Sequence, residues 1–182
     1  MIKEFFKNYR DNYLFPIRKQ IYDLVTESSR VIDLGCGDGE LLRILSPKID
    51  YGKGVDTNKK DIELAKKLNE KRSFSNIEFV CEDAEKCIKG NFDYSVLMFV
   101  LHTLDYNSQV KILRKAREIS KEILIIDFKE NNNFLIHLDE TLSGHYKNFK
   151  NYLVSGGVEN LVNSEFVERF DTYKNSIGIW RI

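Results

Sequence analysis

Proline, cysteine and tryptophan are scarce in this sequence, which has two, three and one of them among 182 residues. The cysteines, Cys36, Cys81 and Cys87, are odd in number and form no C-x-x-C pair, so neither a disulfide framework nor a metal site is predicted. We expect Cys81 and Cys87 to pack as small apolar groups. Repeats, low-complexity tracts and interdomain linkers are also missing, which favours one domain over residues 1–182.

An excess of charge of either sign is missing too, because 28 basic residues balance 28 acidic ones. Such a balance creates no overall field that would attract nucleic acid or an anionic membrane, and we expect neither as a partner. The longest charge-free apolar run, Tyr94 to Leu104, is well short of the ~20 residues that span a bilayer. The N-terminus has no signal-peptide core, so the sequence predicts a cytoplasmic protein. Its oligomeric state stays open.

The most informative stretch is Val31 to Leu42, V-I-D-L-G-C-G-D-G-E-L-L. An apolar segment ends in an acid, glycine follows at positions 35, 37 and 39, and apolar residues then resume at helical spacing. This pattern predicts a strand, a tight turn and a helix. Because glycine permits φ > 0 and has no Cβ, a ligand can lie directly against peptide groups at the N-terminus of that helix.

The spacing of these glycines argues against a dinucleotide. The dinucleotide fingerprint is G-x-G-x-x-G, whereas here the third glycine comes one residue early, and Asp33 would repel a diphosphate. An acid at this point suits a cationic ligand better. The phrase D-L-G-C-G-D-G resembles the nucleotide-binding loop of the class I S-adenosylmethionine-dependent methyltransferases. Their cofactor carries a sulfonium and an ammonium group but no phosphate.

A second acid, Asp56, ends the short strand that we expect at residues 51–56, and it follows Gly39 by 17 residues. A carboxylate at the end of the second strand of a βαβ unit can accept hydrogen bonds from both ribose hydroxyls. The alternative is an acid that caps the next helix, although Asn58 is the expected N-cap there. A third acid, Asp83, follows the strand expected at 77–81.

The resemblance implies that Asp83 receives the adenine amino group and that the backbone of Ala84 meets a ring nitrogen, with an ordinary polar turn as the alternative. The nearly unbroken apolar run from Phe92 to Leu101 predicts a central parallel strand. By resemblance, the segment after it faces the methyl group, which puts His102 at the mouth of the active site. A histidine that closes the strand for structural reasons is equally compatible with the sequence. The cofactor-binding residues implied are Asp33, Gly35, Cys36, Gly37, Gly39, Asp56, Thr57, Asp83, Ala84, Phe99 and His102.

Three helical segments flank these motifs. Residues 1–28 form an N-terminal amphipathic helix, which we expect Pro16 to interrupt, and its Tyr9 and Tyr13 belong either to the core or to a lid over the substrate. A second helix is expected over 108–120. Its predicted inward residues are Val110, Leu113, Ala116 and Ile119.

The third helix is expected within 134–153. One face of it is predicted to hold Leu142, Tyr146, Phe149 and Leu153, and Ser155-Gly156-Gly157 ends it. Glycine inside a helix costs ~1 kcal/mol relative to alanine. Gly144 therefore indicates a close approach, either at a pocket that includes His145 or between two helices.

Strands alternate with helices five times, and two final strands at 165–171 and 176–182 form a hairpin. The predicted fold is α/β, a doubly wound Rossmann-like sheet, and the resemblance implies seven strands in the order 3-2-1-4-5-7-6 with strand 7 antiparallel. The function we expect is methyl transfer from S-adenosyl-L-methionine to a small-molecule acceptor by in-line displacement. If the acceptor must lose a proton, the catalytic candidates are His102, His145 and Tyr146, with His137 as the remaining histidine. The alternatives are a module that binds the cofactor or its product without turnover and, less favoured by the glycine spacing, a nicotinamide oxidoreductase.

Overall fold

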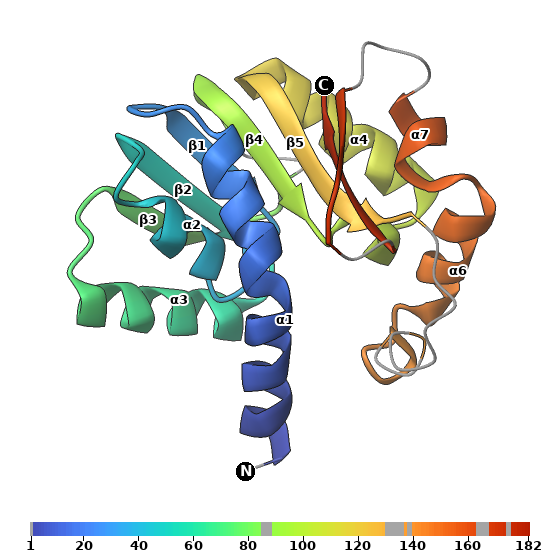
Figure 1. Cartoon of the computed structure of the whole chain (residues 1–182), viewed down its shortest axis with the longest axis horizontal. Coiled ribbons are helices and arrows are strands. Elements are labelled where there is room, and N and C mark those ends of the chain that lie inside the picture. Colours follow the sequence, from blue (N-terminus) through green and yellow to red (C-terminus); the bar gives the residue numbers. More distant parts are fainter. Residues whose placement is uncertain (1, 85–88, 130–136, 138–139, 163–167, 174–175) are drawn as a thin grey trace.

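The computed structural model describes residues 2–84, 89–129, 137, 140–162, 168–173 and 176–182, and of residues 2–12 only the helical backbone. The chain folds into helices on either side of a twisted sheet (Figure 1). The elements are, in chain order, α1 (Ile2–Leu24), β1 (Arg30–Leu34), α2 (Glu40–Leu45), β2 (Tyr51–Asp56), α3 (Lys59–Arg72), β3 (Ile77–Cys81), β4 (Phe92–Met98), the 3-10 turn η1 (Leu101–Thr103), α4 (Tyr106–Ile119), β5 (Ser120–Phe128), α6 (Tyr146–Val154), α7 (Gly157–Val162), β6 (Glu168–Asp171) and β7 (Ile177–Arg181).

The strands form one sheet of seven in the order β3-β2-β1-β4-β5-β7-β6. Strands β1 to β5 pair in parallel, whereas β7 runs antiparallel to both β5 and β6. This confirms the predicted doubly wound sheet and its order. The chain builds the sheet outward from β1 in one direction and from β4 in the other, so the carboxyl ends of β1 and β4 flank the switch point where ligands bind in such folds.

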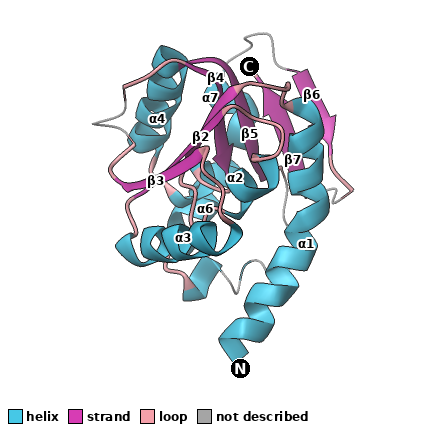
Figure 2. Cartoon of the chain, turned by 90° about the vertical axis from the view of Figure 1, so that its left-hand side faces the viewer, coloured by secondary structure: helices cyan, strands magenta, loops and turns pink. Residues whose placement is uncertain are grey.

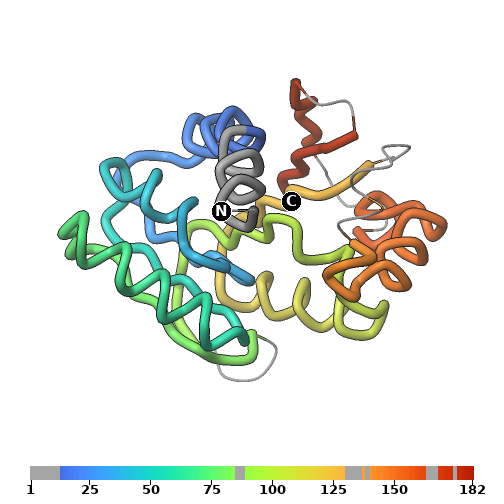
Figure 3. Tube along the Cα trace, turned by 90° about the horizontal axis from the view of Figure 1, so that it is seen from below, coloured from blue at the N-terminus to red at the C-terminus, as the bar shows by residue number. Residues whose placement is uncertain are grey.

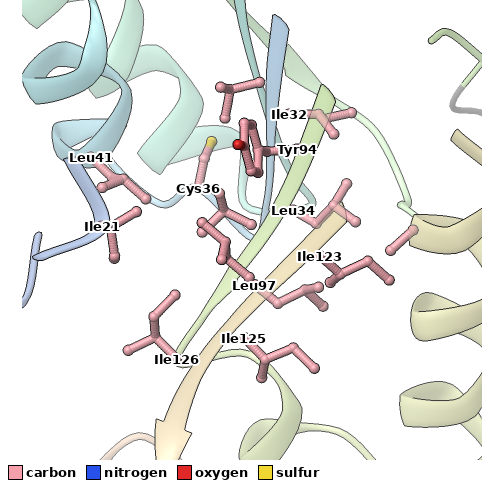
Figure 4. Packing of buried hydrophobic residues seen from close by; sticks show 14 of the residues in the cluster. Ile21, Ile32, Leu34, Cys36, Leu41, Tyr94, Leu97, Ile123, Ile125 and Ile126 are labelled. Carbon is pink, nitrogen blue, oxygen red and sulfur yellow. The ribbon is translucent and has the colours of Figure 1, made fainter. Parts of the chain in front are cut away.

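Helices cover both faces of the sheet. The chain adds strands in one direction from β1 and in the other direction from β4, so right-handed crossovers place the helices of the two halves on opposite faces. Figure 2 shows α1 and α4 on either side of the strands, and the view from below in Figure 3 shows the same layers. In the core, Ile21 of α1 and Leu41 of α2 lie on one side, while Ile123 and Ile125 of β5 point toward α4 (Figure 4). The central strands are therefore buried on both faces, as the apolar runs predict.

Helix α1 is continuous through Pro16, so the predicted interruption there is wrong. Proline removes one helical hydrogen bond, but Pro16 lies on the exposed side of the helix. On the other side, Ile17 and Ile21 are completely buried. Their packing supports the helix, because tertiary burial of an amphipathic face contributes more to helix stability than local propensity does.

Helix α4 confirms the predicted helix and three of its four predicted inward residues, Leu113, Ala116 and Ile119. Val110 is exposed, whereas Ile112 is buried beside Leu113. Gln109 also occupies a buried position at the start of the helix. Its side-chain amide donates to the carbonyl oxygens of Leu101 and Leu104, at 2.9 and 3.0 Å. A pattern of apolar residues cannot predict this buried position, because the residue is polar.

The single helix predicted within 134–153 is also wrong, because a turn separates residues 140–142 from α6. Gly144 has φ +80°, which ends the preceding helical segment in the left-handed region. Leu142 is 78% exposed, and the buried face of α6 consists of Phe149 and Tyr152. Residues 134–136, 138 and 139 lie outside the described part.

The end of the chain agrees with the predicted turn and hairpin. Ser155 is the C-cap of α6, and Gly156 and Gly157 have φ +90° and +60°, as expected of a glycine stop signal. The short helix α7 that follows is not predicted by the sequence. Strands β6 and β7 form the expected antiparallel pair, while residues 165–167 lie outside the described part. None of the described helices has the length and apolar character that crossing a membrane requires.

Candidate active site

The glycine loop between β1 and α2 has the conformation that its sequence predicts. Gly35, Gly37 and Gly39 have φ +83°, +53° and +75°. A Cβ on Gly35 would lie 2.5 Å from Val100 Cγ2, and one on Gly39 would lie 2.3 Å from Phe79 Cε1, whereas nothing lies within 4 Å of that position on Gly37. The two outer glycines are therefore required by packing, and the middle one leaves its surface open to a ligand.

The side chain of Arg43, in α2, stabilises the conformation of this loop. Its buried guanidinium donates to the Asp38 carbonyl at 2.6 Å and to Glu40 Oε2 at 2.6 and 3.1 Å. Sequence reasoning missed this role, although the Glu40–Arg43 spacing of three on a helix is the signal that indicates such a pair. The loop is thus held in place without any ligand.

Asp56 ends β2 and faces the loop. Its Oδ2 accepts a hydrogen bond from the Gly37 N–H at 2.9 Å, and its Oδ1 accepts one from the Asn58 N–H at 2.8 Å. The N-cap of α3 is Asn58, whose side chain accepts from the Lys60 N–H at 3.1 Å, so the helix-cap alternative for Asp56 does not hold. Thr57, between the two, is exposed.

Asp33, near the end of β1, is a buried carboxyl group 2% exposed. Burial and the nearby charge of Asp56 raise the pKa of Asp33 to about 7, and Arg18 of α1 opposes them. Its Oδ1 accepts no hydrogen bond from any described residue. A buried carboxylate oxygen without a donor is costly, and it fits a cationic ligand better than an anionic one.

Two other predicted segments meet the same edge of the sheet. The Glu82 N–H donates to the Asp56 carbonyl at 3.1 Å, so the turn that holds Asp83 and Ala84 follows β3 directly beside Asp56. Ala84 packs against the core. The expectation for Cys81 is wrong, because that thiol is exposed at the last position of an edge strand. Cys87 lies outside the described residues.

The end of β4 lies across the loop from Asp56. Phe99 has φ +59°, which turns the chain out of the strand, and the next residue, Val100, covers Gly35. Cys36 of the loop is buried, and burial raises the pKa of its thiol, so it is no nucleophile near neutral pH. The predicted residues of the loop and of β2, β3 and β4 therefore gather at one edge.

His102, in η1, is buried and does not line an open mouth. Its Nδ1 lies 2.6 Å from Asp127 Oδ1, and its Nε2 lies 3.3 Å from Glu140 Oε1. Burial disfavours the imidazolium, but the two carboxylates outweigh it and raise the pKa of His102 to about 9. The imidazole is therefore protonated near neutral pH.

His145 and Tyr146, the other catalytic candidates, are exposed at the start of α6. The ring of Tyr146 lies edge-on to His137 with centroids 5.8 Å apart. Nothing lies within 4 Å of the Cβ position of Gly144, so the expected close approach there, whether pocket or helix contact, is wrong. The catalytic roles of His145 and Tyr146 stay predictions.

Helix α1 is attached to the turn between β6 and β7. The Tyr173 hydroxyl donates to the Tyr13 carbonyl, the two rings lie 6.5 Å apart, and the Gln20 amide donates to the Asp171 carbonyl at 3.2 Å. Because β7 begins opposite the end of β5, this turn lies at the carboxyl edge of the parallel strands. Tyr13 therefore borders the candidate site, whereas the side chain of Tyr9 lies outside the described part.

A hollow of about 110 Å³ lies elsewhere, on the flank of β5. No residue of the glycine loop lines it. Its wall includes Lys129, Glu159 and Arg169, and each of these charges already has a partner of opposite sign. We assign no cofactor to it.

Comparison with known families agrees with this arrangement. The family model described as a methyltransferase domain matches residues 26–165. The chain belongs to this methyltransferase family. Membership of this family implies S-adenosyl-L-methionine as the cofactor.

Individual relatives share the methyltransferase fold at low identity. The carboxy-S-adenosyl-L-methionine synthase of Trichodesmium erythraeum is 28% identical over 128 residues, which cover 67% of this chain and 50% of that protein. The mitomycin 7-O-methyltransferase MmcR has a TM-score of 0.72 at 18% identity, covering 98% of this chain and 56% of the other. The methyltransferase domain of bacterial CtHen1-C has a TM-score of 0.67 at 17% identity, covering 94% and 96%. The chain thus spans about half the length of the first two.

The residues at the carboxyl edge of the sheet fit this cofactor. The open surface of Gly37 suits a ligand without steric conflict, and the unpartnered oxygen of Asp33 suits a positive charge. Asp56 is half-exposed and retains acceptor capacity beside its two backbone donors. This edge of the sheet therefore offers an open backbone surface and carboxylate acceptors that suit a cationic nucleoside.

Proposed function

We propose that this methyltransferase transfers the methyl group of S-adenosylmethionine to a small-molecule acceptor. The observation that carries the cofactor site is the combination of an open glycine, Gly37, with a carboxylate fastened to it, Asp56, and a buried carboxylate oxygen without a donor, on Asp33. When bound, the cofactor supplies an electrophilic methyl group on a positively charged sulfur. The protein's part is to orient both reactants and exclude water.

Each residue of the site has a proposed task. Asp56 accepts hydrogen bonds from the ribose hydroxyls, and Asp33 compensates the positive charge at the amino-acid end. Asp83 and the backbone of Ala84 receive the adenine. The peptide groups from Gly35 to Gly39, together with Cys36, form the surface beneath the nucleoside. Thr57 and Phe99 border it, and the backbone before His102 meets the methionine part.

A small acceptor is supported by composition and by the neighbours of the site. The net charge of zero provides no general attraction for nucleic acid. Tyr13 and Phe99 border the site with partly exposed rings, and aromatic rings with a few polar groups are typical of small-molecule sites. The fold does not decide the acceptor, because the relatives include an enzyme named for mitomycin and a domain of CtHen1-C.

The experiment that separates an enzyme from a binding module is methyl transfer itself. The protein is incubated with methyl-labelled S-adenosylmethionine and a metabolite extract, and the labelled products are identified by mass spectrometry. We expect a labelled small molecule and an equal amount of S-adenosylhomocysteine. Tight cofactor binding with no labelled product would favour the binding module, and a labelled macromolecule would exclude the small acceptor.

A further inference from the structure

The buried cluster of His102, Asp127 and Glu140 joins three parts of the chain. Asp127 lies near the end of β5, His102 in η1, and Glu140 in the segment before α6. The imidazole lies between the two carboxylates, with Nδ1 2.6 Å from Asp127 and Nε2 3.3 Å from Glu140. All three side chains are almost fully buried, at 3%, 0% and 8% exposure. A charged cluster at this depth needs an explanation beyond stability.

The two carboxylates differ in how well their oxygens are satisfied. Asp127 Oδ1 accepts from the Phe128 N–H at 2.8 Å as well as facing the imidazole, and Oδ2 accepts from the His102 N–H at 3.3 Å. Glu140 Oε1 faces the imidazole, but its Oε2 is buried and accepts no hydrogen bond from the described residues. Both oxygens of Asp127 thus accept hydrogen bonds within the protein, whereas Oε2 of Glu140 can still accept one from another donor.

The charges of the cluster also indicate which of its groups can accept a proton. The groups around the imidazole are the carboxyl groups of Asp127 from β5 and Glu140 from its own segment, and the ring of Tyr152 from α6 at a centroid distance of 6.4 Å. The Tyr152 hydroxyl donates to the Phe128 carbonyl at 3.2 Å, and burial raises the pKa of this phenol well above its usual value. The imidazolium therefore lies between the carboxyl groups of Asp127 and Glu140. A protonated imidazole has no lone pair that can take a further proton, so Glu140 is the base that remains.

The cluster lies next to the proposed cofactor site. Val100, two residues before His102, covers Gly35 of the glycine loop. Phe99, which turns the chain at the end of β4, has its ring edge-on to the imidazole at 6.3 Å. The Asn148 amide donates to the Thr103 carbonyl at 2.7 Å, so the start of α6 is fastened over the same turn. The segment from Phe99 to Thr103 therefore connects the cluster and the start of α6 to the glycine loop.

We propose that Glu140 contacts the methyl acceptor and receives its proton, with His102 and Asp127 as positioning residues, and that the acceptor therefore carries an O–H or N–H group. This proposal rests on the proposed function. The acceptor heteroatom forms a bond to the methyl carbon, and the carbon–sulfur bond breaks with its electron pair left on sulfur. The proton of the acceptor goes to Glu140 Oε2, and its former bonding pair stays on the heteroatom. The imidazolium holds Glu140 in place and does not exchange its proton.

The test compares the wild-type protein with Glu140→Gln, which keeps the side-chain shape and removes the charge, and with Glu140→Asp. The matched control is Glu159→Gln, an exposed carboxylate paired with Arg169 at 2.7 Å. The acceptors are catechol and benzylamine, which carry O–H and N–H groups, and thioanisole, an aromatic sulfide without an exchangeable proton. Methyl-labelled S-adenosylmethionine reports transfer, and calorimetry with S-adenosylhomocysteine reports cofactor binding.

We expect labelled catechol or benzylamine and no labelled thioanisole. Glu140→Gln should lower kcat by about 100-fold or more without changing the affinity for S-adenosylhomocysteine. Glu140→Asp should restore part of the rate, and Glu159→Gln should behave as wild type. Glu140→Gln with the wild-type kcat, equal labelling of thioanisole, or no transfer to catechol and benzylamine by a protein that binds S-adenosylhomocysteine would each overturn the proposal. A wild-type protein that binds neither form of the cofactor would instead overturn the proposed function.

A second readout does not depend on turnover. The His102 imidazole is titrated by NMR in histidine-labelled protein, with His137→Gln and His145→Gln used to assign the other two signals. We expect a protonated ring at neutral pH and a pKa lower by about 1 unit or more in Glu140→Gln, because one anionic neighbour is gone. A ring that is neutral at pH 7 in the wild type would make His102 the base and overturn the assignment to Glu140. This readout also decides the matter if Glu140→Gln folds poorly.

Discussion

The two ends of the site use carboxylates in opposite ways. At the β1–β2 edge, Asp56 accepts hydrogen bonds from two backbone N–H groups, and Oδ1 of Asp33 is buried without a hydrogen bond from the described residues. At the β5 edge, Asp127 and Glu140 face a cation of the protein's own, His102. The first edge thus keeps one buried carboxylate oxygen that a cationic ligand can satisfy, with Arg18 of α1 as the protein's own nearby cation, whereas the second is nearly complete without a ligand. The difference teaches that paired acids at a strand end do not by themselves indicate which reactant they serve.

The largest expected effect on the free energy of unfolding is at the β5 edge. Replacing His102 with Gln leaves two buried carboxylates without their cation, and breaking a buried ion pair costs about 3–5 kcal/mol. The free energy of unfolding, measured with urea at pH 7, should fall by that amount. The loss should shrink as the pH rises. The folded protein raises the pKa of His102 from 6.5 to about 9, so protonation of His102 stabilises the fold fully below pH 6.5, and this stabilisation is lost as the pH rises through 9. A loss that is the same at pH 6 and pH 9 would contradict the imidazolium.

Two glycines of the loop are expected to differ in role, Gly39 in packing and Gly37 in ligand binding. Gly39→Ala forces a Cβ against Phe79 at φ +75°, and left-handed strain together with overpacking should lower the free energy of unfolding by about 2–4 kcal/mol. Gly37→Ala meets no neighbour, so strain alone should cost about 1–2 kcal/mol. Thermal melts and calorimetry with S-adenosylhomocysteine should show that Gly37→Ala loses more affinity than stability. Equal melting temperatures for the two variants would contradict this division.

Asp33→Asn should change stability in the other direction from His102→Gln. A carboxyl whose folded pKa is raised to about 7 favours unfolding once it ionises, so this penalty is absent below the unfolded value of 3.8 and complete above about pH 7. The variant should therefore gain on the order of 4 kcal/mol of stability at pH 8 and none at pH 3.5. It should also bind S-adenosylmethionine more weakly. A destabilised variant at pH 8 would show that Asp33 is satisfied within the protein.

The last of these effects is on cofactor binding and concerns the ribose. Two charge-assisted hydrogen bonds of ~1.5–3 kcal/mol each are lost in Asp56→Ala, so affinity for S-adenosylhomocysteine should fall at least tenfold, measured by calorimetry. Glu63→Gln, an exposed carboxylate on α3, is the control and should leave the affinity unchanged. An Asp56→Ala protein with wild-type affinity would leave Asp56 only its role in holding Gly37.

The parts of the fold that sequence predicts well are those with strong local patterns. Apolar runs mark the central strands, and three glycines in alternation mark the loop, because strand burial and positive φ restrict residue type locally. The failures have local patterns that mislead. Gln109 is buried because its amide has carbonyl partners that no periodicity reveals. Gly144 looks like a glycine inside a helix but ends one.

The acceptor end was predicted only in part for a different reason. His102 is visible in the sequence, but its partners lie 25 and 38 residues further along the chain. Which acids meet across a strand end depends on the register of β5 and on the path of the segment that follows it. A single sequence contains many acids at such distances, so Asp127 and Glu140 carried no signal of their own.

The central claim is that the β1–β2 edge binds a cationic nucleoside cofactor, and calorimetric titration tests it most directly. The protein is titrated at pH 7 with S-adenosylmethionine and with NAD, in two buffers of different ionisation enthalpy. We expect S-adenosylmethionine to bind and NAD not to bind. A cation beside Asp33 lowers the pKa of that carboxyl from about 7, so binding should release a fraction of a proton, and Asp33→Asn should abolish the release. Binding of NAD without a response to S-adenosylmethionine would contradict the account.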